Sequence, residues 1–123
     1  MEGYNGKKLW VFPDLEMPKE GQGELKGHES IIILNMNQKP ANISMSFYFD
    51  DKDPVKDVNA IIDAERVRCF RTNNSNDFNG IELQHGKQYA LRIESDIEVV
   101  VQYGRLDVTQ PNMAFYTVMG YCK

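Results

Sequence analysis

The sequence has few of the residues that build metal, disulfide and redox sites. Its 123 residues include two cysteines and two histidines, and no Cys-x-x-Cys or His-Glu-x-x-His spacing occurs. A structural zinc site needs about four soft ligands at compatible spacing, so neither a metal site nor a cofactor is expected. Cys69 and Cys122 are expected to be free thiols, because one pair without a secretory signal is weak support for a disulfide.

Long apolar runs and an excess of basic charge are also missing. No apolar run exceeds the four residues of Ile31 to Leu34, whereas a membrane span needs about 20. No apolar stretch of signal-peptide length follows the N-terminus, which predicts a cytoplasmic protein without membrane insertion. The net charge of −4 argues against nucleic acid as a partner, since binding phosphates requires a positive surface.

Alternation of apolar and polar residues dominates the chain, and no window has a helical stripe. In residues 41–50, for example, Ile43, Met45, Phe47 and Phe49 fall on one face. We therefore expect an all-β protein: a single-domain antiparallel β-sandwich of about eight short strands with little or no helix. The domain spans residues 1–123, of which 1–6 are expected to form a flexible tail. The expected strands are 7–13, 28–36, 41–50, 58–64, 66–72, 89–93, 98–103 and 113–121.

Polar residues at the ends of two expected strands point to a binding site rather than a reaction. The apolar run in residues 97–101 gives way to Tyr103, Arg105 and Asp107, and the pair His28 and Glu29 precedes another apolar strand. His28, Glu29 and Asp107 could supply acid–base groups, but neighbouring strand residues point to opposite faces. No nucleophile elbow is present either. We therefore expect no catalytic residues and no enzyme activity.

A small carbohydrate is the ligand that this set of side chains suits best. Carbohydrate sites stack an aromatic ring on the sugar and bind its hydroxyls with planar polar groups. The residues that offer these features are Trp10, His28, Asn35, Tyr103, Arg105 and Asp107. For Trp10 the alternative is a core position, because Leu9, Val11 and Phe12 surround it and aromatic residues usually pack inside.

Two further segments suggest surfaces for partners. Arg66 and Arg68 share a strand face with Phe70, while Arg71 lies opposite; such a face can hold nucleic acid or an anionic ligand. The alternative is a solvated face whose arginines pair with Asp63 and Glu65. Residues 113–121 are apolar on both faces, which favours contact with another subunit. The alternative there is a central strand covered on both sides within one protomer.

Several motifs, taken in order, resemble the sensory rhodopsin transducer family, including its relatives in organisms without a rhodopsin. The matching pieces are Trp10, residues 28–35, residues 47–55, the segment Ala64-x-Arg66 to Arg71-x-Asn73, and residues 100–107. Together they span about residues 7–121. This chain has Tyr103 where rhodopsin-linked members often carry histidine.

The resemblance implies a β-sandwich that forms a homotetramer and acts as a non-enzymatic binding or signalling module. Family-level proposals are carbohydrate binding and, for some members, DNA binding, while rhodopsin-linked members dock on the cytoplasmic side of the photoreceptor. The resemblance implies that a site in this chain is lined by the positions that match the family pattern, which are His28, Glu29, Arg71, Asn73, Arg105 and Asp107. Three functions thus stand open: a carbohydrate-binding module, an adaptor that passes on a signal from a membrane receptor, and a DNA-binding regulator.

Overall fold

A computed structural model describes residues 5–110 and 112–123 of the chain; the first four residues of the expected N-terminal tail lie outside this range. The protein is all-β, with one sheet system of eight strands and one short 3-10 helix, η1 (Ser75–Phe78). Every strand pair is antiparallel. The expected fold class is confirmed.

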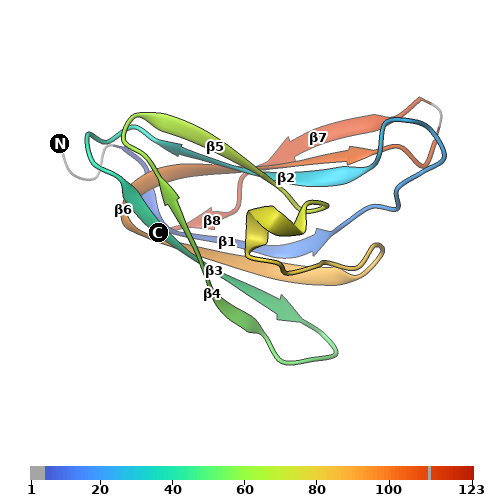
Figure 1. Cartoon of the computed structure of the whole chain (residues 1–123), viewed down its shortest axis with the longest axis horizontal. Helices are drawn as coiled ribbons and strands as arrows, with labels where there is room; N and C mark the ends of the chain where they lie inside the picture. Colours follow the sequence, from blue (N-terminus) through green and yellow to red (C-terminus); the bar gives the residue numbers. More distant parts are fainter. Residues whose placement is uncertain (1–4, 111) are drawn as a thin grey trace.

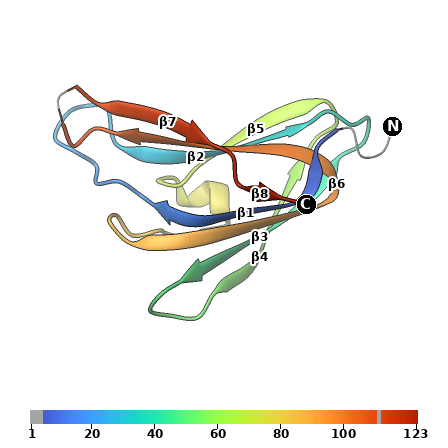
Figure 2. The same cartoon turned by 180° about the vertical axis from the view of Figure 1, so that it is seen from behind.

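The strands form two layers that share one long strand (Figures 1 and 2). We call β4-β3-β6-β1-β8 the β3 layer and β5-β2-β6-β7 the β2 layer. Residues 88–95 of β6 pair with β1 and β3, and residues 100–107 pair with β2 and β7. The strand bounds are β1 (Lys7–Glu16), β2 (His28–Asn35), β3 (Ala41–Phe49), β4 (Val55–Ile62), β5 (Arg66–Arg71), β6 (Gln88–Asp107), β7 (Ala114–Val118) and β8 (Tyr121–Cys122).

Several expected strand bounds are wrong: β1 extends to Glu16, β4 spans Val55–Ile62 instead of 58–64, and two segments are divided differently. The strands expected at 89–93 and 98–103 are one continuous strand, β6, which bends from one layer into the other. The strand expected at 113–121 divides into β7 and β8, and β8 crosses to the β3 layer, where it pairs with β1. Gly120 permits this crossing, because a Cβ there would lie 2.5 Å from the Val11 carbonyl oxygen.

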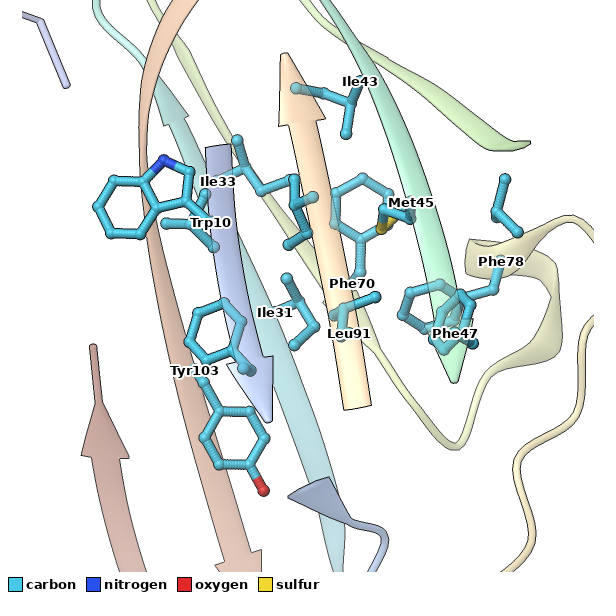
Figure 3. Close-up of a cluster of buried hydrophobic side chains, with 14 of the residues drawn as sticks. Trp10, Ile31, Ile33, Ile43, Met45, Phe47, Phe70, Phe78, Leu91 and Tyr103 are labelled. Atoms are coloured by element: carbon cyan, nitrogen blue, oxygen red, sulfur yellow. The ribbon is translucent and has the colours of Figure 1, made fainter. Parts of the chain in front are cut away.

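The core lies between the inner faces of the two layers (Figure 3). Alternation on β3 and β6 places every second side chain inside, as the pattern predicts. Phe78 from η1 closes the core with an edge-on contact to Phe47 at 5.5 Å between ring centroids. Trp10 is also a core residue, only 3% exposed, and its Nε1 donates to the carbonyls of Lys7 and Val99.

A buried amide fixes the turns at the bent end of the sandwich. Asn35 is fully buried. Its Nδ2 donates hydrogen bonds to the carbonyls of Lys39, Ile62 and Asp63. Its Oδ1 accepts from the backbone amide and the side-chain amide of Asn37. These bonds satisfy the side chain completely. The prediction that Asn35 binds a sugar is therefore wrong, because its polar atoms hold the turns after β2 and β4.

The carboxy-terminal strands lie at layer edges with their side chains exposed. Phe115 is 68% exposed and Tyr121 is 62% exposed, and Tyr116, Val118 and Met119 are also exposed. Among the described residues β7 pairs only with β6, and its side chains are exposed, so it is not a central strand covered on both sides within this part of the protomer. Across residues 5–110 and 112–123, no helix has the length and apolarity needed to cross a bilayer.

Candidate functional site

A fully buried carboxylate joins the two layers at the end of the sandwich away from the bend in β6. Glu29 lies on the inner face of β2, where Oε1 accepts a hydrogen bond from the Tyr89 hydroxyl at 2.7 Å. Oε2 accepts from the Tyr103 hydroxyl at 2.5 Å. Tyr89 belongs to the half of β6 in the β3 layer and Tyr103 to the half in the β2 layer. One side chain thus connects both halves of β6.

Burial dominates the electrostatics of this cluster. Desolvation raises the pKa of Glu29 above its ordinary value, although the hydrogen bonds from Tyr103 and Tyr89 and the charge of Arg105 act in the other direction. Burial and the neighbouring Glu29 carboxylate also raise the pKa values of both tyrosines. The two phenols therefore remain protonated donors toward Glu29.

Arg105 extends the cluster toward the surface. It lies directly opposite Glu29 on β2 and opposite Tyr116 on β7. Its Nη1 donates to the Glu16 carbonyl at 3.1 Å, and its Nη2 lies 3.4 Å from Asp107 Oδ2. Its side chain is 17% exposed. The guanidinium therefore ties β6 to the end of β1, where the chain enters the loop 17–27.

Asp107 is more accessible than its arginine partner. Its side chain is 29% exposed, and Oδ1 accepts from the Thr109 amide at 2.9 Å and the Thr109 hydroxyl at 2.6 Å. These two bonds lower its pKa below the ordinary value. A shallow hollow of about 170 Å³ adjoins it. The Arg105–Asp107 pair is thus partly exposed, with most of its polar atoms bonded within the protomer.

A larger cavity, which we call the rim cavity, opens next to this cluster. Its volume is about 390 Å³, and it lies between loop 17–27 and the segment that follows β5. The buried side chains of Met17, Thr72 and Leu83 line it, together with polar or charged side chains. These polar residues are Glu20, Lys26, Asn73, Ser75, Glu82 and His85.

Charges of both signs meet at the rim cavity. Glu20 carries its carboxylate 3.5 Å from His85 Nε2 and 4.0 Å from Lys26 Nζ. His85 Nδ1 lies 2.6 Å from the Pro18 carbonyl oxygen. A carbonyl only accepts, so Nδ1 carries a proton and fixes the ring against the loop. The lining therefore offers carboxylate, amide, hydroxyl and cationic groups around a partly apolar floor.

Backbone pairing connects the rim cavity to Glu29. The Thr72 amide donates to the Glu29 carbonyl at 3.0 Å, and the Glu29 amide donates to Thr72 Oγ1 at 3.1 Å. On the other side of the cavity, Arg105 holds the Glu16 carbonyl next to Met17. The cluster around Glu29 thus positions two walls of the rim cavity.

The structure brings together four of the residues predicted for the site, Glu29, Tyr103, Arg105 and Asp107. Asn73 lines the rim cavity instead. Arg71 is exposed at the end of β5, where its amide donates to Asp77 Oδ2.

Two predicted site residues face elsewhere. His28 follows the alternation of β2 and points to the face opposite Glu29, with Nδ1 3.0 Å from the Lys26 carbonyl oxygen. The interpretation of Trp10 as a sugar platform is wrong for this protomer, because its ring is enclosed in the core and offers no free face.

Sequence reasoning missed Tyr89, Thr72 and the charged rim of the cavity. Tyr89 sits in a regular alternation with Leu91 and Ile93, which marks it only as a core residue. Its hydroxyl meets Glu29, 60 residues away in the chain. His85 and Glu20 lie in two separate loops, and no motif in the sequence relates them.

Fold and site together define a β-sandwich protein with a polar cluster at one end of its core and a small cavity beside it. The model of the family described as "Anabaena sensory rhodopsin transducer" matches residues 5–122, and the chain therefore belongs to that family. The family resemblance expected from the sequence motifs is confirmed.

Solved structures agree with this assignment. The crystal structure of Thermotoga maritima 1070 superposes with a TM-score of 0.84 at 31% identity, covering 97% of each chain. The Anabaena sensory rhodopsin transducer has a TM-score of 0.69 at 28% identity, covering 80% of this chain and 96% of that one. No curated protein matches the chain.

Proposed function

We propose that this protein is a non-enzymatic, cytoplasmic binding module that takes a small carbohydrate or a related polyhydroxylated ligand in the rim cavity. The observation that carries this proposal is the cavity itself. Its volume of about 390 Å³ falls within the roughly 300–1,000 Å³ typical of small-molecule sites. Polar groups surround its apolar floor.

The chemistry of the lining favours hydroxyl groups over a single strong charge. Glu20 and Glu82 accept hydrogen bonds from hydroxyls, while Asn73 and Ser75 both donate and accept. The opposite charge of Lys26 offsets part of the acidity. Met17 and Leu83 supply the apolar surface on which the C–H face of a sugar ring packs, in the place of the aromatic platform that the sequence suggested.

The cluster around Glu29 has a positioning role in this proposal. Arg105 orients the start of loop 17–27 through the Glu16 carbonyl. The Glu29 backbone orients Thr72, because its carbonyl accepts from the Thr72 amide and its amide donates to Thr72 Oγ1. Neither side chain needs to touch the ligand. The family positions at Glu29 and Arg105 would then maintain the shape of the cavity, and Asn73 would contact the ligand.

A thermal-shift screen of neutral sugars, amino sugars and sugar acids tests the proposal. A ligand present at about 100 times its Kd should stabilise the folded protein by roughly 2.7 kcal/mol through mass action. The Asn73→Ala variant should bind the same ligand about tenfold more weakly, because it loses a side-chain hydrogen bond.

Asn59→Ala is the matched control, since Asn59 is exposed on β4 outside the cavity. Equal loss of affinity in both variants would contradict the location of the site. A screen in which no polyhydroxylated compound shifts the melting temperature would contradict the function.

We also propose that the protein assembles with itself, as a homotetramer, through the exposed surface of β7 and β8. Phe115, Tyr116, Val118, Met119 and Tyr121 form an exposed apolar surface on these strands. Surfaces of this kind on a soluble protomer mark interaction sites.

The same apolar surface favours one second function, an adaptor that docks on a receptor protein and passes on a signal. The relative from Anabaena is named a sensory rhodopsin transducer. An adaptor of this kind would retain a defined membrane receptor in a pull-down without any stabilising sugar. A protein whose β7 surface is fully covered by its own copies would exclude it.

A further inference from the structure

The outer edge of β5 leaves backbone groups open for hydrogen bonding. Within residues 5–110 and 112–123, β5 pairs only with β2 and forms the edge of its layer (Figure 1). The Arg71 amide points away from β2, because it donates to Asp77 Oδ2, whereas the next amide, Thr72, donates back to Glu29. In an antiparallel pair this direction alternates along the strand. Val67 and Cys69 therefore direct their amides and carbonyls outward, as Arg71 does.

Side chains block the edge strand of the other layer, β4, but not the outer edge of β5. On β4, the Asn59 carbonyl accepts from Asn79 Nδ2 and the Ile61 carbonyl accepts from Arg68 Nη1. Side chains that occupy an edge in this way prevent another strand from pairing there. Within the described part of the chain, no side chain bonds to the outward groups of Val67 or Cys69, and Val67 is 62% exposed.

Unpaired positive charge surrounds this open edge. In residues 5–110 and 112–123, no carboxylate lies within ion-pair distance of Arg66, Arg68 or Arg71. The alternative expected from the sequence, pairing with Asp63 and Glu65, is not formed; Arg66 donates to the Glu65 backbone carbonyl instead. Arg68 lies over the Phe70 ring at 4.4 Å, which holds its charge beside the edge.

We propose that the β5 edge is a docking site for an extended acidic segment of a partner protein, which adds to the β2 layer as a further strand. The backbone groups of Val67 and Cys69 would pair with the incoming strand, and Val67 would contact its apolar side chains. Acidic side chains on that strand would meet the three arginines. Strand addition of this kind takes affinity from main-chain bonds and specificity from side chains. The site is separate from the rim cavity, so either can fail alone.

A fluorescence-anisotropy titration with a short labelled peptide of alternating glutamate and valine tests this proposal. The full chain should bind this peptide, with affinity that falls as salt is added. Val67→Pro removes one outward amide without breaking the pairing with β2, since proline is tolerated on edge strands. It should weaken binding about tenfold, as should Arg66→Glu. Lys56→Glu, a charge reversal at an exposed position of β4, should leave affinity unchanged.

A version of the peptide methylated at every backbone nitrogen keeps every charge but has no amide left to donate to a strand edge. It should not bind, and this measurement does not depend on whether Val67→Pro folds. Equal binding of the methylated peptide would overturn the proposal, as would no binding of the parent peptide. Binding of duplex DNA, with no binding of the peptide, would also overturn the proposal, because it would identify the arginines as a nucleic-acid surface.

Discussion

Replacing Tyr103 by phenylalanine removes one hydroxyl from the core and leaves the ring in place. That hydroxyl donates to Glu29 Oε2, and the Tyr89 hydroxyl donates to Oε1. No other side chain donates to the Glu29 carboxylate in the described chain. The substitution therefore removes the phenol donor from Oε2 of a buried carboxylate, which makes Tyr103→Phe the most direct test of the Glu29 cluster.

The expected cost follows from the burial of Glu29. A hydrogen bond to a charged group contributes about 1.5–3 kcal/mol to stability. When the donor is lost inside the core, the acceptor stays buried without that partner, and its desolvation further lowers the free energy of unfolding. Glu29 and Tyr103 are both buried, at 0% and 3% exposed, so the lost hydroxyl leaves a desolvated acceptor. We therefore expect Tyr103→Phe to lower the free energy of unfolding by about 2 kcal/mol.

Urea unfolding followed by tryptophan fluorescence measures this loss, because the single Trp10 lies in the same core. Tyr48→Phe is the control: this tyrosine is exposed on β3, and its substitution should change stability by less than about 0.5 kcal/mol. In a Glu29→Gln background, Tyr103→Phe should cost less, because the charge that it stabilises is gone. Equal losses in the control and the test variant would refute the reasoning, and so would additive losses in the double variant.

Three other changes test separate features. Burial raises the pKa of Glu29, so the folded state binds an extra proton at pH values between the unfolded and the folded pKa. The stability of the wild type relative to Glu29→Gln should therefore fall as the pH rises through that window. Urea titrations from acid to neutral pH measure this difference in stability, and a difference that does not change with pH would contradict the prediction. Gly120→Ala should destabilise the protein by about 2 kcal/mol or more, because the new Cβ would overlap the Val11 carbonyl. Gly23→Ala is the control: its Cβ would meet no atom within 4 Å, so its stability should be nearly that of the wild type. Thermal unfolding measures both variants. Phe115→Ser should reduce the mass of the assembled protein in light scattering without lowering the stability of the protomer. Ile61→Ser, which replaces an exposed apolar residue on β4, should leave the mass unchanged. An unchanged mass for Phe115→Ser would contradict assembly through β7.

Local patterning was sufficient to predict most of the fold. Alternation of apolar and polar residues, and turn residues such as Asn, Asp and Pro between the strands, predicted the bounds of β2, β3 and β5 to within one residue. The same rule failed at β6, because the consecutive polar residues Glu94, Ser95 and Asp96 resemble a break between two strands. The structure has one continuous strand there, and the bend that divides it between the layers depends on tertiary pairing. It also failed at Gly120, where the change of layer depends on a close approach to β1.

The site was less accessible to sequence reasoning because its parts come from distant segments. The spacing of Tyr103, Arg105 and Asp107 on one strand could be recognised, and so could Glu29 at the start of another. Tyr89 looked like an ordinary core residue, and the buried Trp10 looked equally suited to core or platform. The rim cavity depends on how loops around residues 20 and 85 fold toward each other, which no local pattern records.

Because β6 is a member of both layers, its pairing fixes the two layers relative to each other at the bend near residues 95–99. The Glu29 carboxylate spans the opposite end. Loss of the bonds that Glu29 and Arg105 make at that end would therefore change the spacing of the layers there, and with it the position of the walls of the neighbouring cavity.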